Sequence, residues 1–177
     1  MRKVILQVAV TLDGFIEGPK GECDWCLPPD GQEMKEFLKR IDALFLGRKS
    51  FEMIGSKPFG KKKNYVFSNT LKKSSGQTEI VSGDIAQQVR KIKMMEGKDI
   101  WLFGGASLTT SLMNEGLVDG LELAVHPILL GSGKLLFQGI KRRVKTKLID
   151  ARTYPPIFGS TSKRGTGSNP GRTSSAA

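Results

Sequence analysis

The sequence predicts an α/β fold with a mainly parallel central sheet and an antiparallel part toward the C-terminus. In the first half of the chain, short apolar runs alternate with segments of helical spacing, the order that builds a parallel sheet covered by helices. The apolar runs are nearly continuous, as expected of strands buried on both faces. Residues 144–149 instead alternate apolar with polar residues, a pattern typical of an exposed antiparallel strand.

The first half is expected to contain strands at residues 4–10, 42–47, 65–67 and 79–83. Residues 11–14 end the first strand in a turn that leads into a Gly- and Pro-rich loop through Gly21. A helix with Asp30 as its cap is expected next, because one face collects Met34, Phe37, Leu38 and Ile41. A further helix begins at Arg48, and another follows Asp84, its predicted cap.

The stretch 99–108 is an apolar run that stops at Gly104 and Gly105 and restarts as an amphipathic helix. Gly116 stands where a C-terminal cap belongs. Further strands are expected at 121–126, 134–137 and 144–149, with a turn at 127–133. From residue 159 the sequence has no large apolar side chain, so the expected organisation is a domain over 1–158 and a disordered polar tail over 159–177.

The charge balance favours an anionic ligand. The chain has 177 residues, enough for one domain with a real core, and a hydrophobic content of 38% that fits a globular protein. Lys and Arg number 28 against 17 Asp and Glu, a net charge of +11. The basic clusters at 61–63, 72–73 and 141–143 carry no interleaved aromatic residues, so phosphorylated small molecules are expected as partners and nucleic acid is not.

Two cysteines, Cys23 and Cys26, have the spacing of a redox pair or of half a zinc site. His126 is the single histidine of the chain, which leaves zinc short of ligands, and Pro28 follows where a redox pair would open a helix. Free thiols in a reducing cytoplasm are the favoured interpretation. The apolar run after Met1 reads as a first strand rather than a signal peptide, and no run is long enough to span a membrane.

Ligands of parallel α/β sheets bind at the carboxyl ends of the strands, where Asp13, Ser82 and three pairs of residues fall: Gly47 and Arg48, Ser68 and Asn69, Gly104 and Gly105. A glycine followed by cations and a hydroxyl at a helix start suits a phosphate, although plain tight or solvated turns remain alternatives. Residues 131–134 lack the spacing of a nucleotide-binding loop. His126 is interpreted as packed or hydrogen-bonded, since no nucleophile lies near it in sequence.

These motifs together resemble the dihydrofolate reductase superfamily in order and spacing: residues 9–16, 25–30, 46–52, 66–69 and 103–107. Residues 116–133 look more like the branch that contains the reductase domain of bacterial riboflavin biosynthesis, the RibD C-terminal domain. The resemblance covers about residues 2–156. It implies a three-layer fold with a mainly parallel eight-stranded sheet. It also implies an NADPH-dependent oxidoreductase, dimeric and cytoplasmic, that passes a hydride to a pteridine or a ribosylaminopyrimidine.

By position, the resemblance implies four groups of site residues. Gly47, Arg48, Lys49 and Ser50 would hold NADPH phosphate, and Ser68 and Asn69 would lie near the adenosine ribose and its 2′-phosphate. The pyrophosphate would meet Gly104, Gly105, Ala106 and Ser107, while Ala9 would line the nicotinamide pocket. Asp30 is the candidate acid that hydrogen-bonds the substrate ring and helps supply a proton. Helix capping is the rival role for Asp30, and Glu33 could serve instead.

The end of the sequence departs from the family pattern. The family closes its sheet with an apolar antiparallel strand, whereas only Ile157 and Phe158 precede the polar tail here. An exposed edge at 144–149 and lowered stability are the expected consequences. The sequence leaves open which substrate is reduced, and a non-catalytic nucleotide- or phosphate-binding protein on the same fold is the alternative function.

Overall fold

The computed structural model describes residues 1–27, 31–55 and 59–153. The chain divides into two units, Met1–Lys145 and Thr146–Ala177. The first unit holds every helix and strand of the described residues, and residues 146–153 of the second form none. The predicted cap Asp30 and the predicted tail at 159–177 lie outside the described residues.

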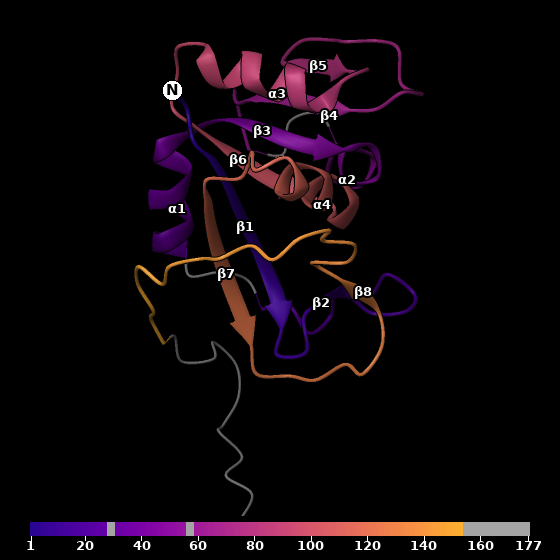
Figure 1. Ribbon diagram of the computed structural model, residues 1–177, viewed down its shortest axis with the longest axis vertical. Coiled ribbons are helices and arrows are strands. Elements are labelled where there is room, and N and C mark those ends of the chain that lie inside the picture. The colour runs from indigo at the N-terminus through magenta and orange to yellow at the C-terminus, as the bar shows by residue number, and fades with distance from the viewer. Residues whose placement is uncertain (28–30, 56–58, 154–177) are drawn as a thin grey trace, which may run out of the picture. The chain divides into compact units, whose positions relative to one another are not determined.

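Six strands form the central sheet in the order β5, β4, β3, β6, β1, β7, and every neighbouring pair is parallel (Figure 1). Their bounds are β1 (Val4–Thr11), β3 (Ile41–Gly47), β4 (Lys63–Phe67), β5 (Thr78–Val81), β6 (Asp99–Gly104) and β7 (Gly120–His126). A small antiparallel sheet pairs β2 (Phe15–Glu17) with β8 (Lys134–Leu135). The predicted α/β class with a mainly parallel sheet is therefore confirmed.

Four helices cover the two faces of this sheet: α1 (Gly31–Arg40), α2 (Arg48–Ile54), α3 (Ile85–Met94) and α4 (Ala106–Asn114). Phe37 of α1 and Phe51 of α2 pack with Ile5 and Trp101 on one face. The other face buries α3 and α4, for example through Leu112. Successive strand residues point to opposite faces, so covering both faces buries the apolar runs of the central strands, such as Ala43–Leu46 of β3 and Ile100–Leu102 of β6. Within the described residues, no helix has the length and apolarity to cross a membrane.

Two helix ends follow the sequence prediction. The Asp84 carboxylate caps α3 by accepting the Gln87 backbone N–H at 3.0 Å. At the end of α4, Gly116 has a φ of +65°, and its N–H donates to the Met113 carbonyl at 3.1 Å. The next N–H, from Leu117, reaches back to the Leu112 carbonyl at 2.9 Å, which completes a Schellman motif.

Several boundaries differ from the prediction. Ile41 begins β3 rather than closing the helical face of α1, and residues 15–17 form β2 where a loop is expected. The strand expected at 134–137 ends at Leu135, and the one expected at 144–149 is not formed. Alternation predicts only which face a strand would bury, because a strand also needs a neighbour for its backbone N–H and C=O groups.

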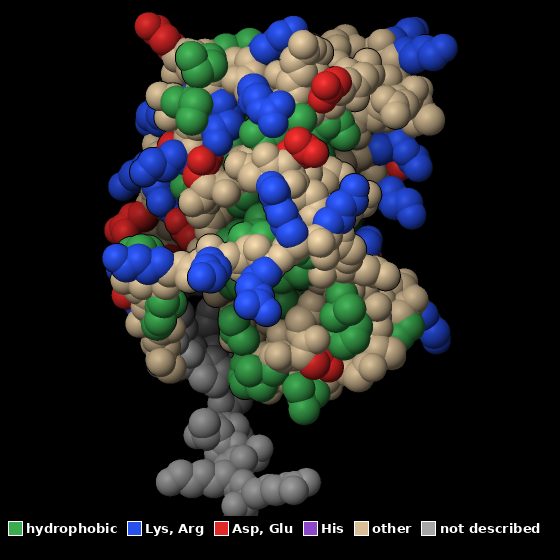
Figure 2. Space-filling model, in the orientation of Figure 1, with side chains coloured by type: hydrophobic (Ala, Val, Ile, Leu, Met, Phe, Trp, Pro, Cys, Tyr) green, Lys and Arg blue, Asp and Glu red, His purple; other side chains and the backbone are tan. Residues whose placement is uncertain are grey.

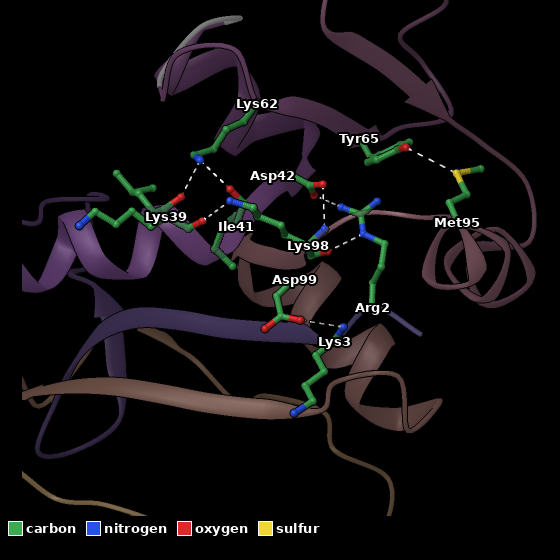
Figure 3. Close-up of polar contacts among 11 residues, drawn as sticks. Arg2, Lys3, Lys39, Ile41, Asp42, Lys62, Tyr65, Met95, Lys98 and Asp99 are labelled. Carbon is green, nitrogen blue, oxygen red and sulfur yellow. Dashed lines mark hydrogen bonds and ion pairs between the residues drawn. The ribbon is translucent and has the colours of Figure 1, made fainter.

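At the amino edge of the sheet, charged side chains fix the ends of the elements (Figure 3). Lys62 Nζ donates to the carbonyls of Leu38 at 2.7 Å and Ile41 at 2.6 Å, and Lys98 Nζ donates to the Lys39 carbonyl at 2.7 Å. The two ammonium groups therefore satisfy carbonyls at and just beyond the C-terminal end of α1, where the helix dipole favours cations. Burial, together with the charge of Lys98, lowers the pKa of Lys62.

Most cations of the chain are exposed, and Figure 2 shows Lys and Arg side chains dispersed over one face among other kinds. Arg2 and Lys93 are the buried cations among the described residues. Arg2 pairs with Asp42, and its Nε donates to the Lys98 carbonyl at 2.6 Å. Lys93 Nζ lies 2.6 Å from Asp119 Oδ2, which also accepts the Val4 N–H at 2.7 Å. Each pair ties strand β1 to segments distant in sequence.

We predict that Asp119→Ala lowers the free energy of unfolding by about 3 kcal/mol, because it leaves the Lys93 ammonium buried and unpaired. Urea denaturation followed by tryptophan fluorescence measures the change. The matched control is Glu115→Ala, which removes the partner of Arg90 in a pair whose side chains are 58% and 53% exposed. This control should cost less than about 1 kcal/mol. Equal losses in the two variants would contradict the role given to the buried pair.

Candidate functional site

Strands β3 and β6 are neighbours whose following helices leave toward opposite faces of the sheet. Helix α2 follows Gly47 and packs on the face of α1, whereas α4 follows Gly105 and packs on the face of α3. The two turns therefore diverge at the carboxyl ends of adjacent parallel strands. This arrangement is the topological switch point at which open α/β sheets bind ligands.

Bare backbone lines this switch point. A Cβ atom placed on Gly47 would lie 3.5 Å from the Gly105 nitrogen and 3.6 Å from the Gly104 oxygen. A Cβ atom placed on Gly105 would lie 3.5 Å from Ser50 Oγ. Gly104 has a φ of +122°, a conformation that favours glycine, and the peptide bond between Gly104 and Gly105 is cis. The structure thus brings together four of the predicted cofactor-binding residues.

Four predicted residues lie in the first turns of the two helices. Arg48 is half exposed, and its Nη1 donates to both carboxylate oxygens of Glu52, at 2.9 and 3.0 Å. Lys49 is exposed on the same turn. In α4, Ser107 is exposed, whereas Ala106 is 6% exposed and belongs to the core. No side chain caps the N-terminus of α4 at Gly105, so its first turn is bounded by backbone alone.

Ser68 and Asn69 follow the end of β4, the strand beside β3, in the register that pairs Phe67 with Gly47. Ser68 Oγ accepts the N–H groups of Thr70 at 3.2 Å and Leu71 at 3.0 Å. This hydroxyl organises the turn that follows β4. Asn69 is exposed at the same turn.

Ala9 lies on the part of β1 that extends past β6. The pairing of β1 with β6 ends at Leu6 and Leu102, whereas its pairing with β7 continues to Thr11 and His126. Trp101 Nε1 donates to the Gln7 carbonyl at 3.0 Å. This indole N–H therefore satisfies the carbonyl of the first β1 residue beyond the β1–β6 pairing. Within the described residues, the β6 side of β1 therefore has no strand neighbour at Ala9, which is half-buried there.

The two candidate acids are placed differently. Asp30 lies outside the described residues. Glu33 lies in the first turn of α1 and is half-buried. Another carboxylate is fixed at the end of β1, where Asp13 accepts the Thr11 hydroxyl at 2.5 Å and the Gly131 N–H at 2.7 Å. The Thr11 hydroxyl is the main cause that lowers the pKa of Asp13.

A Trp–His pair lies at the carboxyl end of β7, and the sequence patterns did not predict it. The rings of Trp25 and His126 meet edge to face with centroids 5.3 Å apart. Burial lowers the pKa of His126. Within the described residues, His126 Nε2 and Trp25 Nε1 are buried without a hydrogen-bond partner. The interpretation of His126 as packed fits this contact. The indole comes from a loop 101 positions earlier in the sequence, and no periodicity links the two residues.

The segment at 131–134 has a structural role in place of the rejected nucleotide loop. A Cβ atom on Gly133 would lie 2.2 Å from the Glu17 carbonyl oxygen, so only glycine fits this close approach. Lys134 Nζ lies 3.0 Å from Glu17 Oε1, which ties β8 to β2. The described residues contain no group of three or more His, Cys, Asp or Glu side chains that could hold a metal ion.

Comparison with known proteins gives a consistent result. The family model described as the RibD C-terminal domain matches residues 2–158. The Bacillus subtilis protein YyaP is 43% identical over 168 residues, which cover 86% of this chain and 89% of YyaP. A putative riboflavin biosynthesis protein from Shewanella sp. PV-4 has a similar structure, with a TM-score of 0.74, 23% identity and coverage of 85% and 91% of the two chains. Dihydrofolate reductase from Enterococcus faecalis, complexed with NADP(H) and RAB-propyl, has a TM-score of 0.60, 24% identity and coverage of 78% and 79%.

We predict that His126, the single histidine, titrates below its ordinary pKa of about 6.5 in the folded protein. Because folding disfavours the protonated ring, stability should be full above the unfolded pKa and fall as the pH drops through it. NMR titration of the imidazole in native and urea-unfolded protein measures both pKa values. His126→Gln should remove this part of the pH dependence, and a native pKa at or above the unfolded one would contradict the prediction.

Proposed function

Because this chain belongs to the RibD C-terminal domain family, we propose that it is an NADPH-dependent reductase that passes a hydride to a pteridine-like or ribosylaminopyrimidine substrate. The family and the shared fold point to a reductase of riboflavin or folate metabolism. The nicotinamide cofactor is supported by the fold shared with a reductase complexed with NADP(H). The substrate class rests on the resemblance to the riboflavin branch.

The main support for the proposal is the position of the glycines at the switch point. A phosphate can approach the backbone at Gly47 and Gly105 because neither residue has a side chain, and a Cβ atom at either position would contact the facing turn. The uncapped first turn of α4 offers its N–H groups and the positive end of the helix dipole to an anion. These features fit a pyrophosphate without further side chains.

Cations beside the glycines would add affinity and distinguish the phosphates. Arg48 and Lys49 stand at the start of α2, where charge-assisted hydrogen bonds to a phosphate are strong. The Glu52 carboxylate holds the Arg48 guanidinium in a defined position in the absence of ligand. When a phosphate binds, Arg48 would leave Glu52 and bind the phosphate. Ser68 and Asn69, one strand away, would face the ribose and its 2′-phosphate.

The reaction needs a flat surface for a ring and a proton source. When bound, NADPH supplies the hydride. Ala9 lies on the stretch of β1 that extends past its pairing with β6. Its small side chain leaves room for a planar ring at the carboxyl ends of the central strands. Asp30 would hydrogen-bond the substrate ring and hold the proton that the reduced product requires, with Glu33 as the second candidate.

We also propose a homodimer and a cytoplasmic location. Among the strands that the structure describes, β7 is the last in the order of the central sheet, and Val125 on it is 55% exposed, so this edge could accept a second copy. A cytoplasmic location agrees with two unpaired cysteines at the surface.

We predict that NADPH quenches tryptophan fluorescence in a saturable way. Gly105→Val should weaken binding at least about tenfold, because the side chain fills the space beside Ser50 that a pyrophosphate needs. Arg48→Ala should weaken binding by a similar factor through loss of one charge-assisted contact. The matched control is Gly120→Ala, at the amino end of β7, where a Cβ atom lies 3.8 Å from Ile5 and the φ is not positive.

Turnover separates the two candidate functions. Oxidation of NADPH in the presence of a pteridine or a ribosylaminopyrimidine, followed by absorbance, supports the reductase, and Asp30→Ala should then lower the rate with little change in NADPH affinity. NADPH binding without turnover of either substrate class would favour the non-catalytic binding protein. Absence of saturable quenching at high micromolar NADPH would reject the cofactor site.

A further inference from the structure

Cys23 and Cys26 lie at the two ends of one reverse turn. The Cys26 N–H donates to the Cys23 carbonyl at 3.0 Å, the i to i+3 hydrogen bond of a β-turn. Such a turn brings its end Cα atoms within about 7 Å. A disulfide usually spans about 4.4–6.8 Å between Cα atoms, so the separation at the ends of a β-turn is compatible with a disulfide.

Both thiols are free and exposed. Their contacts are weak: Cys23 Sγ lies 3.7 Å from the Ile16 carbonyl, and Cys26 Sγ lies 3.8 Å from the Leu27 carbonyl. Little native structure would be lost by turning either sulfur toward the other. Metal binding is a weaker use of the pair, because within the described residues no third Asp, Glu or His completes a ligand group.

The surroundings keep both sulfurs protonated. Cys23 is exposed at the surface, but partial desolvation of its thiol is the main cause that raises its pKa. The carboxylates of Glu17, Asp24 and Glu22 raise it further, while Lys134 opposes them. Burial also raises the pKa of Cys26, with a smaller effect of Cys23. Exchange at neutral pH is therefore slow. The reduced form gains no stability from a thiolate, which favours a disulfide that persists once it forms.

We propose that Cys23 and Cys26 form a reversible intramolecular disulfide by exchange with a low-molecular-weight disulfide such as oxidised glutathione. One cysteine thiolate attacks the small disulfide, forms a mixed disulfide and releases one small thiol. The second cysteine then attacks the mixed disulfide and releases the second small thiol. The protein loses two protons and two electrons, and the small disulfide takes them up and is reduced to two thiols.

The disulfide would act on the contact between Trp25 and His126. This residue lies inside the ring that the bond closes, and its indole packs on His126 at the carboxyl end of β7. Closing the ring restricts the turn and holds the indole against the histidine. The proposal is independent of the proposed reductase function, because it concerns only the thiols and the turn that carries Trp25.

The test equilibrates the full chain in glutathione buffers of varied redox ratio, followed by acid quenching, alkylation and mass spectrometry. We expect both thiols to be lost in one transition. The oxidised product should be a single chain, with no covalent link to a second chain and no bound glutathione. In concentrated urea the same transition should need a buffer at least tenfold more oxidising, because the unfolded chain lacks the turn. Tenfold corresponds to about 1.4 kcal/mol of stabilisation of the fold by the disulfide.

The controls are Cys23→Ser and Cys26→Ser, each of which should gain one glutathione that dithiothreitol removes. Oxidation of the wild type should also reduce acrylamide quenching of tryptophan, since Trp101 is 3% exposed and Trp25 provides the accessible signal. Neither serine variant should show that change. Two bound glutathiones, covalent dimers or equal midpoints in native and unfolded protein would overturn the proposal, and unchanged quenching would overturn the effect on Trp25.

Discussion

A single constraint organises the molecule: the six strands of the central sheet all run in one direction. Every strand therefore presents its carboxyl end at one edge and its amino end at the other. The amino edge is held by side-chain charges, with Arg2 paired to Asp42 and Lys93 paired to Asp119. The carboxyl edge carries glycine turns with exposed backbone. The chain thus places its two buried ion pairs and its candidate phosphate contacts on opposite edges of one sheet.

Much of the fold follows from local sequence. The buried strands are predictable because both faces are covered, so each appears as an apolar run, and the caps at Asp84 and Gly116 are readable from residue type. Prediction from the sequence fails where the structure of a segment depends on a neighbouring strand. Residues 144–149 have the alternation of a strand without forming one, and residues 15–17 form β2 because residues 134–135 are there to pair with it.

The candidate site was predictable to a similar extent. Strand ends followed by Gly47 and Gly105 mark the turns, and parallel pairing makes them neighbours. Two features depend on long-range contacts and could not be read from the sequence: the early end of the β1–β6 ladder and the packing of Trp25 on His126. The first has a weak signal, since the apolar run after Lys3 is longer than the one before Gly104.

The position of β1 in the sheet has a consequence for synthesis of the chain. This strand is synthesised before the other described strands, yet its two neighbours are β6 and β7, whose first residues are Asp99 and Gly120. An N-terminal strand with such distant partners raises the contact order, which slows folding. On the ribosome, β1 stays without strand partners until most of the domain has emerged. A nascent chain stalled before residue 99 therefore exposes an apolar strand and is open to aggregation or chaperone binding.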